Sequence, residues 1–263
     1  MPLTDFQRGV SKLLAQNKSP DSYLAGGAAL HLEPSSKRYS NDLDFFHDSE
    51  KRVNESFKAD RALLEKEGYL VEVQNLFPSF IRAAVSKGED ITKVEWVHDT
   101  SWRFLPVIKD KIVGYRLHPV DLGINKLLAL VGRNEARDFL DMIEICKEVL
   151  PLGALIWAAT GKDPGYSPNL LLEILKRKGS YRAEDFKHLN LTTEPNLKEL
   201  KKSWLLFLKE AEEFINARPV EEIGCLYWST EGKRFIAPTD NQKLDNVQVH
   251  YGRPGGILPN VID

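Results

Sequence analysis

The chain has 263 residues, of which 42% are hydrophobic and 28% are charged. These are the proportions of a soluble globular protein, and they exclude a mostly disordered chain. The formal net charge of −2 excludes adhesion to nucleic acid through bulk charge, so a nucleic-acid partner would need a local basic surface. The two cysteines, Cys146 and Cys225, cannot form a disulfide framework and have no CxxC metal spacing.

No targeting or membrane segment is expected. Residues 1–6 lack a basic region followed by an apolar core, so we expect no secretory signal. The longest apolar stretch, near residues 150–159, is interrupted by Pro151 and Gly153 and is too short to span a bilayer. We therefore expect a cytoplasmic protein.

The first part of the chain alternates between helix and strand patterns. Thr4 is a suitable cap for a helix that ends near residues 17–20, and residues 23–25 then lead into a Gly26-Gly27 turn and a short helix at 28–32. A strand is predicted at 42–46 and a helix at 49–67. Three strand-like runs follow, at 69–76, 79–85 and 91–97. This order, with antiparallel hairpins at the far edge, predicts an α+β N-terminal domain.

The rest of the chain reads as mainly helical with a short tail. Asp121 can cap a helix that reaches Leu130, and further helical segments are predicted at 135–149, 169–178, 183–189 and 197–217. From residue 219 the pattern predicts a hairpin, with strands at 225–228 and 234–237 joined by a turn containing Gly232, and a closing loop at 252–256. We thus expect three parts, 1–118, 119–218 and 219–263, the last packing on the body.

The strand at 42–46 carries two acidic residues in alternation with apolar ones. Side chains alternate faces at about 3.3 Å per residue, so Asp42 and Asp44 share one face roughly 6.6 Å apart, while Leu43 and Phe45 point into the core. Such a pair can hold two magnesium ions about 3.5–4 Å apart, the arrangement used for displacement at phosphorus. GT-A-type glycosyltransferases also use an Asp-x-Asp pair, so the spacing alone does not choose the reaction.

The residues just before this strand suit a phosphate. Gly26 and Gly27 can bring backbone N–H groups close to one, ahead of a helix N-terminus. Ser40 could hydrogen-bond to a phosphate and Arg38 could neutralise it. Together with the Asp pair, this order of features indicates a nucleotidyl-transfer site.

Such a site usually needs a third carboxylate on a neighbouring strand. In the run at 91–97, Val94 and Trp96 form a core face, so Glu95 points to the other side. We expect Glu95 to complete the metal site and to deprotonate the attacking hydroxyl. Asp99, near the end of the same strand, is the alternative.

A second cluster lies in the helical region. Arg137 and Asp141 are four residues apart and Asp138 and Asp141 three apart, so they can share a helix face. Lys126 sits in an apolar stretch of the preceding helix and could reach the triphosphate of a nucleotide, oriented by Asp138. The basic run 176–178 and the stripe of Lys198, Lys201 and Lys202 read as solvated helix faces that could contact an RNA backbone.

These motifs, taken in order, resemble those of the AbiEii/AbiGii toxin family of the polymerase-β-like nucleotidyltransferase superfamily. The resemblance rests on residues 24–30, 38–46 and 94–96, and on 126–130 together with 137–141. It covers roughly the first 150 residues with specific motifs and the following region only in general character. It implies a mixed sheet in the N-terminal domain.

The resemblance also implies a bacterial enzyme that uses Mg2+ and a nucleoside triphosphate such as ATP. The enzyme would transfer the nucleoside monophosphate to an acceptor and release pyrophosphate. Asp42, Asp44 and Glu95 would hold the metal, Lys126 would contact phosphates and Asp138 would support the site. The acceptor could be tRNA, and a cognate antitoxin could be the partner.

Two residues depart from the superfamily pattern. Gly27 stands where a serine is frequent, and Glu95 stands where aspartate is usual, which moves the carboxylate about one methylene outward. Two other functions stay open at this stage: a catalytically silent nucleotidyltransferase fold that acts as a binding module, and a metal-dependent glycosyltransferase.

Overall fold

The chain forms two compact units. The computed structural model describes residues 3–32, 38–238 and 246–259. The first unit consists of Met1–His118, Asn190–Thr193 and Pro254–Gly256, and the second holds the remaining residues.

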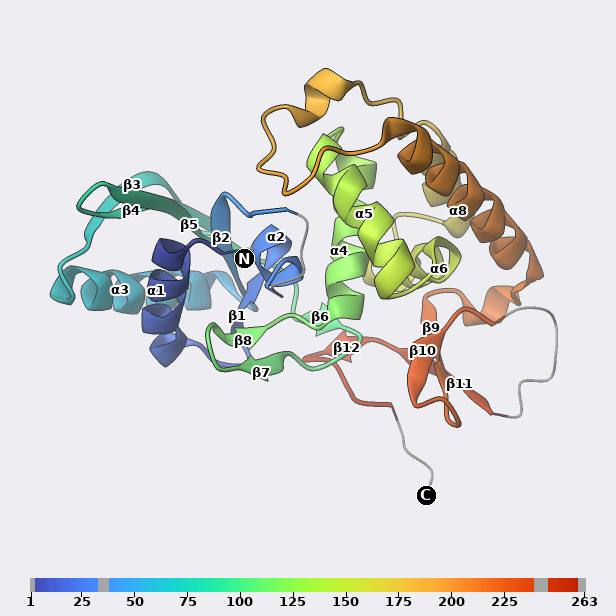
Figure 1. Cartoon of the computed structure of the whole chain (residues 1–263). Coiled ribbons are helices and arrows are strands. Elements are labelled where there is room, and N and C mark those ends of the chain that lie inside the picture. Colours follow the sequence, from blue (N-terminus) through green and yellow to red (C-terminus); the bar gives the residue numbers. More distant parts are fainter. Residues whose placement is uncertain (1–2, 33–37, 239–245, 260–263) are drawn as a thin grey trace. The chain divides into compact units, whose positions relative to one another are not determined.

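A seven-stranded sheet forms the centre of the first unit (Figure 1). Its order is β3 (Leu70–Phe77), β4 (Phe80–Lys87), β5 (Asp90–His98), β2 (Asp42–His47), β1 (Ser22–Ala25), β8 (Gly114–Arg116) and β7 (Ile108–Asp110). The β2–β5 and β1–β8 pairs are parallel and the other pairs are antiparallel, so the sheet is mixed, as expected. Strands β7 and β8 were not predicted, because three residues are too few to show an alternating pattern.

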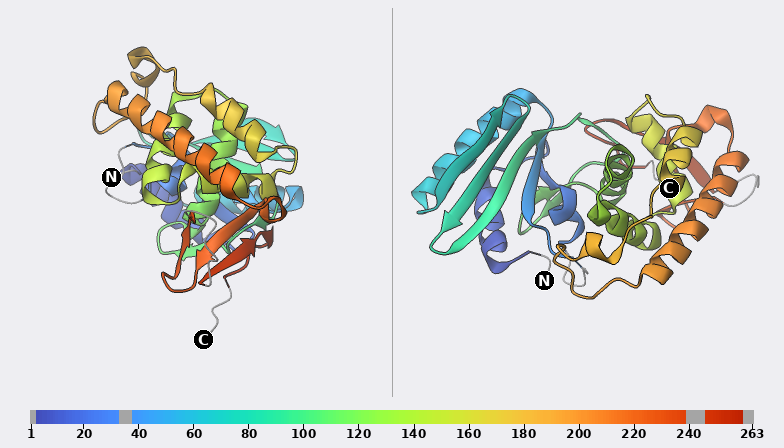
Figure 2. Two further views of the ribbon diagram at one scale, coloured as in Figure 1. Left: turned by 90° about the vertical axis from the view of Figure 1, so that its right-hand side faces the viewer. Right: turned by 90° about the horizontal axis from the view of Figure 1, so that it is seen from above.

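Helices α1 (Asp5–Leu14) and α3 (Glu50–Lys66) lie along one face of this sheet (Figure 2). The Thr4 hydroxyl accepts a hydrogen bond from the Gln7 N–H at 3.1 Å, and the Thr4 N–H donates to the Gln7 side chain at 3.0 Å, which completes the predicted cap. A short 3-10 turn, η1 (Ala15–Asn17), ends α1. The core under these helices includes Leu43 and Trp96, both fully buried. Each such side chain contributes about 1.5–3 kcal/mol by leaving water.

Two segments from late in the chain also belong to the first unit. The Tyr39 N–H donates to the Asn190 carbonyl at 3.0 Å, which fixes the chain just before β2. The Gly255 N–H donates to the Ser101 carbonyl at 2.8 Å. Strand β12 (Arg253–Pro254), of which Pro254 belongs to this unit, pairs with β6 (Trp102–Arg103), so the expected loop at 252–256 is partly strand.

The second unit is mainly helical. Its elements are α4 (Pro119–Gly132), α5 (Ala136–Glu148), α6 (Leu152–Lys162), α7 (Pro168–Lys176), η2 (Ala183–Phe186), α8 (Leu197–Ala217) and η3 (Val220–Glu222), followed by a sheet in the order β10 (Arg234–Ile236), β9 (Cys225–Ser229), β11 (Val247–Tyr251). Helix α6 packs against α8 and β9. At that contact a Cβ on Gly161 would lie 2.4 Å from the Gly224 carbonyl oxygen, so only glycine fits there.

Several elements differ from the sequence expectations. Helix α6 was missed because its first eight residues are all buried, and a helix that is apolar on every side shows no amphipathic period. Asp121 lies inside the first turn of α4 and is 1% exposed, so it is not the cap. Gly26 and Gly27 open the short helix α2 (Gly26–Leu30) instead of forming a turn before it.

The predicted tail hairpin is present as β9 and β10, and β11 adds a third strand to it. Among the described helices, none combines the length and the apolar character needed to cross a bilayer.

Candidate functional site

Strand β2 places the acidic pair on one side of the sheet. Leu43 and Phe45 are fully buried, whereas Asp42 and Asp44 are half-buried. The alternation of the strand therefore separates a core face from an acidic face, as the sequence pattern predicts. The two carboxylates are accessible to a ligand while their strand is fixed by the core behind it.

Strand β5 lies beside β2 (Figure 1) and pairs with it in parallel. In the register of the two strands Asp44 and Glu95 are direct partners, which brings Glu95 to the acidic pair. One carboxylate oxygen from each of Asp42, Asp44 and Glu95 lies within 4.8 Å of the others. The alternative residue, Asp99, lies after the end of β5 and is not among these three.

This group of oxygens fits a divalent cation. Carboxylate oxygens are the ligands that Mg2+ prefers, and three of them within 4.8 Å can share one ion. The backbone also leaves room there: Gly26 has φ +61, and a Cβ on it would lie 2.0 Å from Asp44 Oδ2. Only glycine can follow β1 this closely beside the carboxylate.

Gly27, Arg38 and Ser40 are brought together beside the acidic pair. A Cβ on Gly27 would meet Arg38 Nη2 at 3.0 Å and Ser40 Oγ at 3.2 Å. The Ser40 hydroxyl lies 3.0 Å from the Asp42 carbonyl and 3.4 Å from Asp42 Oδ1, to which it can donate. Ser40 therefore fixes the start of β2, and a phosphate contact from it stays a prediction.

Arg82 is a site residue that the sequence interpretation missed. It lies opposite Glu95 in the antiparallel β4–β5 pair, and both its Nε and its Nη2 are 2.7 Å from Glu95 Oε1. Its guanidinium also lies over the Phe80 ring, 5.3 Å from the centroid. The pairing of Arg82 with Glu95 depends on the register of β4 and β5, which no local sequence pattern reveals. The signal that the sequence offered was an arginine in the predicted strand that precedes the strand of Glu95.

The second cluster forms a buried charge network in the second unit. Lys126 Nζ lies 3.1 Å from Asp138 Oδ1 and 2.9 Å from Asp141 Oδ2, and all three residues are buried. Arg133, which the sequence interpretation did not select, donates from Nε to Asp138 Oδ2 at 2.6 Å. Burial disfavours the charged form of Asp138, but Arg133 and Lys126 outweigh it and hold the pKa of this carboxyl below its usual value.

Arg137 lies beside this network without being held by it. Its Nε is buried and has no hydrogen-bond partner in the described part of the chain. Since no ion pair of Arg137 is found among the residues that the structure describes, its guanidinium is a candidate contact for an anionic ligand. Lys126, by contrast, is already held by two carboxylates.

Comparisons with known proteins agree with this architecture. No protein-family model matches the chain. No curated protein matches it either. Among solved structures, a Helicobacter pylori protein described as a candidate nucleotidyltransferase is similar with a TM-score of 0.55 at 16% identity, over 80% of this chain and 94% of that one. MenT4, a nucleotidyltransferase toxin from Mycobacterium tuberculosis, is similar with a TM-score of 0.51 at 15% identity, over 82% of this chain and 83% of that one. The chain therefore has a fold shared with nucleotidyltransferases, as the resemblance of its motifs implied.

Proposed function

We propose that this protein is a metal-dependent nucleotidyltransferase of the AbiEii toxin type. It transfers a nucleoside monophosphate from a nucleoside triphosphate to an acceptor hydroxyl and releases pyrophosphate. The observation that supports this most directly is the set of three carboxylate oxygens within 4.8 Å on the adjacent strands β2 and β5. The fold likeness favours this reaction over glycosyl transfer.

Asp42, Asp44 and Glu95 are the residues that would hold Mg2+. When bound, the ions lower the pKa of the acceptor hydroxyl and neutralise charge on the phosphates. The oxygen of the acceptor hydroxyl bonds to the α-phosphorus, and Glu95 receives the proton of that hydroxyl. At the same time the bond from the α-phosphorus to the pyrophosphate oxygen breaks. Gly26 allows the backbone to pass beside Asp44, and Arg82 orients the Glu95 carboxylate.

The remaining residues have proposed roles toward the nucleotide. Gly27, Arg38 and Ser40 bind phosphate, supported by their convergence beside Asp42. Arg137 and Lys126 stabilise the charge of the leaving group, and Asp138 and Asp141 fix Lys126. The proposed acceptor is tRNA, with an antitoxin as partner and the cytoplasm as the site of action.

The test is transfer of label from each α-labelled nucleoside triphosphate to total cellular RNA, to protein and to small molecules. Asp44→Asn should lower incorporation at least about 100-fold, because it removes several kcal/mol of electrostatic stabilisation from the transition state. Glu72→Gln, an exposed residue of β3, is the matched control and should leave incorporation unchanged. Urea unfolding of both variants checks that the fold is intact.

Two results would contradict the proposal. Full incorporation by Asp44→Asn removes the carboxylate mechanism. Absence of label from every acceptor, together with no calorimetric binding of Mg2+ and nucleoside triphosphate, favours the silent binding module instead.

A further inference from the structure

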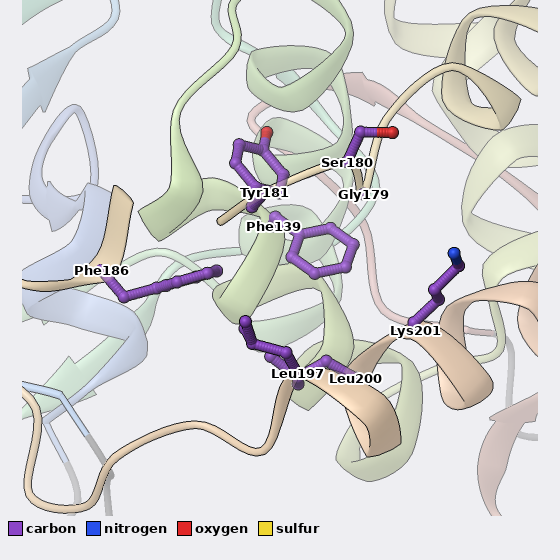
Figure 3. A pocket seen from close by; sticks show the side chains of 8 residues that line it. All are labelled: Phe139, Gly179, Ser180, Tyr181, Phe186, Leu197, Leu200 and Lys201. Atoms are coloured by element: carbon purple, nitrogen blue, oxygen red, sulfur yellow. The ribbon is translucent and has the colours of Figure 1, made fainter. Parts of the chain in front are cut away.

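A cavity of about 290 Å3 lies in the helical unit, outside every residue of the proposed transfer site. Its lining includes Phe139, Gly179, Tyr181, Phe186, Leu200 and Lys201. These residues come from α5, η2, the first turns of α8 and the segment before η2 (Figure 3).

Three aromatic rings give the cavity its character. The Phe139 and Tyr181 rings are 5.1 Å apart at 37°, and the Tyr181 and Phe186 rings are 6.0 Å apart at 65°. Figure 3 shows Tyr181 and Phe139 side by side, with Phe186 pointing toward them. The Tyr181 hydroxyl donates to Asn134 Oδ1 at 3.0 Å, which holds its ring in place. Phe139 and Phe186 are buried, at 2% and 4% exposure, whereas Tyr181 is partly exposed. Tyr181 is therefore the ring that can offer a π face to another planar ring.

Gly179 allows these rings to come together. Its φ is +93, and a Cβ on it would lie 2.8 Å from Trp204 Cδ1 and 3.3 Å from Phe139 Cε2. Trp204 in turn packs edge-on against Phe139 at 5.3 Å. The chain therefore passes directly over the aromatic cluster, and the floor of the cavity is fixed by the core of the unit.

A lysine adds a positive charge to the lining of the cavity. Lys201 lines the cavity and is exposed, and it forms no ion pair with any residue that the structure describes. Lys198 and Lys202, on the same end of α8, are likewise exposed and have no ion-pair partner within the described ranges. The structure thus puts the lysine stripe next to an aromatic cavity, which the sequence pattern alone did not show. A lysine ammonium that has no ion-pair partner among the described residues, placed beside aromatic rings, suits a ligand that is planar at one end and anionic at the other.

We propose that this cavity binds a nucleotide unit, with its base against the ring of Tyr181, which Phe139 and Phe186 support from behind, and its phosphate at Lys201. Stacking accepts any base because every base has a π face, and the lysine supplies the charge for the phosphate. The ligand is either a free nucleotide or one nucleotide of a nucleic-acid chain. The proposal does not depend on the transfer reaction, since it uses none of the residues assigned to it.

The test is calorimetric titration with AMP, with adenosine and with a single-stranded tetranucleotide. We use the Asp42→Asn, Asp44→Asn double variant in EDTA, so that metal-dependent binding at the carboxylates does not contribute. Lys201→Ala should weaken AMP binding about fivefold and leave adenosine binding unchanged, as expected for loss of a partly exposed charge contact. For the tetranucleotide it should also lower the slope of log K against log salt by about 0.7. Lys209→Ala is the control: it lies eight residues further along α8, is exposed, and should change neither value.

Leu200→Trp provides a second test. The indole ring of tryptophan is larger than the leucine side chain and fills the cavity, so the variant should bind none of the three probes. Thermal unfolding checks that the variant is folded. AMP bound as tightly as the tetranucleotide supports a free-nucleotide site, and much tighter tetranucleotide binding supports a nucleic-acid site. The proposal is overturned if neither AMP nor the tetranucleotide binds, as expected for a cavity that receives a protein side chain. It is also overturned if Lys201→Ala and Lys209→Ala weaken binding equally.

Discussion

Arg82 and Glu95 are partners across strands β4 and β5, and both the Nε and the Nη2 of Arg82 lie 2.7 Å from the same oxygen, Glu95 Oε1. The Glu95 side chain is 12% exposed and the Arg82 side chain 38%. The third carboxylate of the proposed site is therefore oriented by a cation that also cancels part of the negative charge of the group. Removing Arg82 should therefore have two opposing effects on activity: tighter Mg2+ binding and a poorer orientation of Glu95.

Arg82→Gln should lower the Mg2+ concentration needed for half-maximal transfer and should also lower kcat. The first effect arises because a positive charge beside the cation site is lost, and the second because Glu95 loses its anchor; each should be about fivefold for a partly exposed pair. Initial rates over a Mg2+ titration measure both. Arg82→Lys retains the charge and should restore the Mg2+ dependence but only part of kcat. A rise in the Mg2+ requirement would contradict this reading of Arg82.

Gly26→Ala should abolish transfer with only a moderate loss of stability. A Cβ there would lie 2.0 Å from Asp44 Oδ2, so the carboxylate must move. Gly88→Ala is a matched control, because Gly88 has φ +64 and nothing within 4 Å of an added Cβ. Both substitutions place a Cβ at a positive φ, which costs about 1–2 kcal/mol. Gly26→Ala should lose this amount of stability plus the cost of moving Asp44, and it alone should lose activity. Equal activity in the two variants would show that the close approach does not matter.

Asp60→Ala should destabilise the first unit by about 3–5 kcal/mol. Asp60 is fully buried, pairs with the equally buried Lys18, and accepts from Trp96 Nε1 at 2.7 Å. Its removal leaves a charged lysine without its counter-ion in the core. Burial already lowers the pKa of Lys18, and Asp60 opposes that shift. Urea unfolding measures the change.

The matched control for this pair is the exposed ion pair of Lys51 with Glu55, whose side chains are 85% and 52% exposed. Lys51→Ala should change stability by at most about 0.5 kcal/mol. A similar small effect for Asp60→Ala would mean that Lys18 finds water or loses its proton on its own.

Stability should fall as the pH is lowered from about 6.5 toward 4.5. Burial, and then the charge of Lys18, lower the pKa of His47 to about 3, and burial and Arg116 lower the pKa of His118 to about 4. In this window the two histidines take up protons in the unfolded chain but not in the folded chain. Their contribution to stability is therefore fully present above about pH 6.5 and is lost as the pH falls below it. The limit is about 1.4 kcal/mol per pH unit for each histidine.

His47→Gln should therefore reduce the pH dependence of the unfolding free energy by about half between pH 6.5 and 4.5. His188→Gln, on the exposed surface of the second unit, is the control and should leave the slope unchanged. The carboxylate Asp138 does not interfere, because its pKa is lowered below 3.8 and its contribution is lost only at more acid pH. An unchanged slope in His47→Gln would show that this ring takes up its proton as readily in the folded chain as in the unfolded one.

The sequence by itself determined the local features of the site. Strict alternation placed Asp42 and Asp44 on one face and Leu43 and Phe45 on the other, because a strand has a side-chain period of two. Helix caps and periodicity likewise located most of the elements, including α3, which the sequence pattern predicts at 49–67. In the strand at 91–97, Val94 and Trp96 form the predicted core face, so Glu95 points to the opposite face.

Only the tertiary structure decided which of these features meet. The pairing of Asp44 with Glu95 and of Glu95 with Arg82 depends on strand register between segments 51 and 13 residues apart, and no local pattern encodes it. Helix α6 was not predicted because it is buried on every side and shows no amphipathic period, and the three-residue strands β7 and β8 are too short to show an alternating pattern. The same holds for Lys201 beside the rings of Phe139, Tyr181 and Phe186: the sequence contains each group, and folding alone brings them to one cavity.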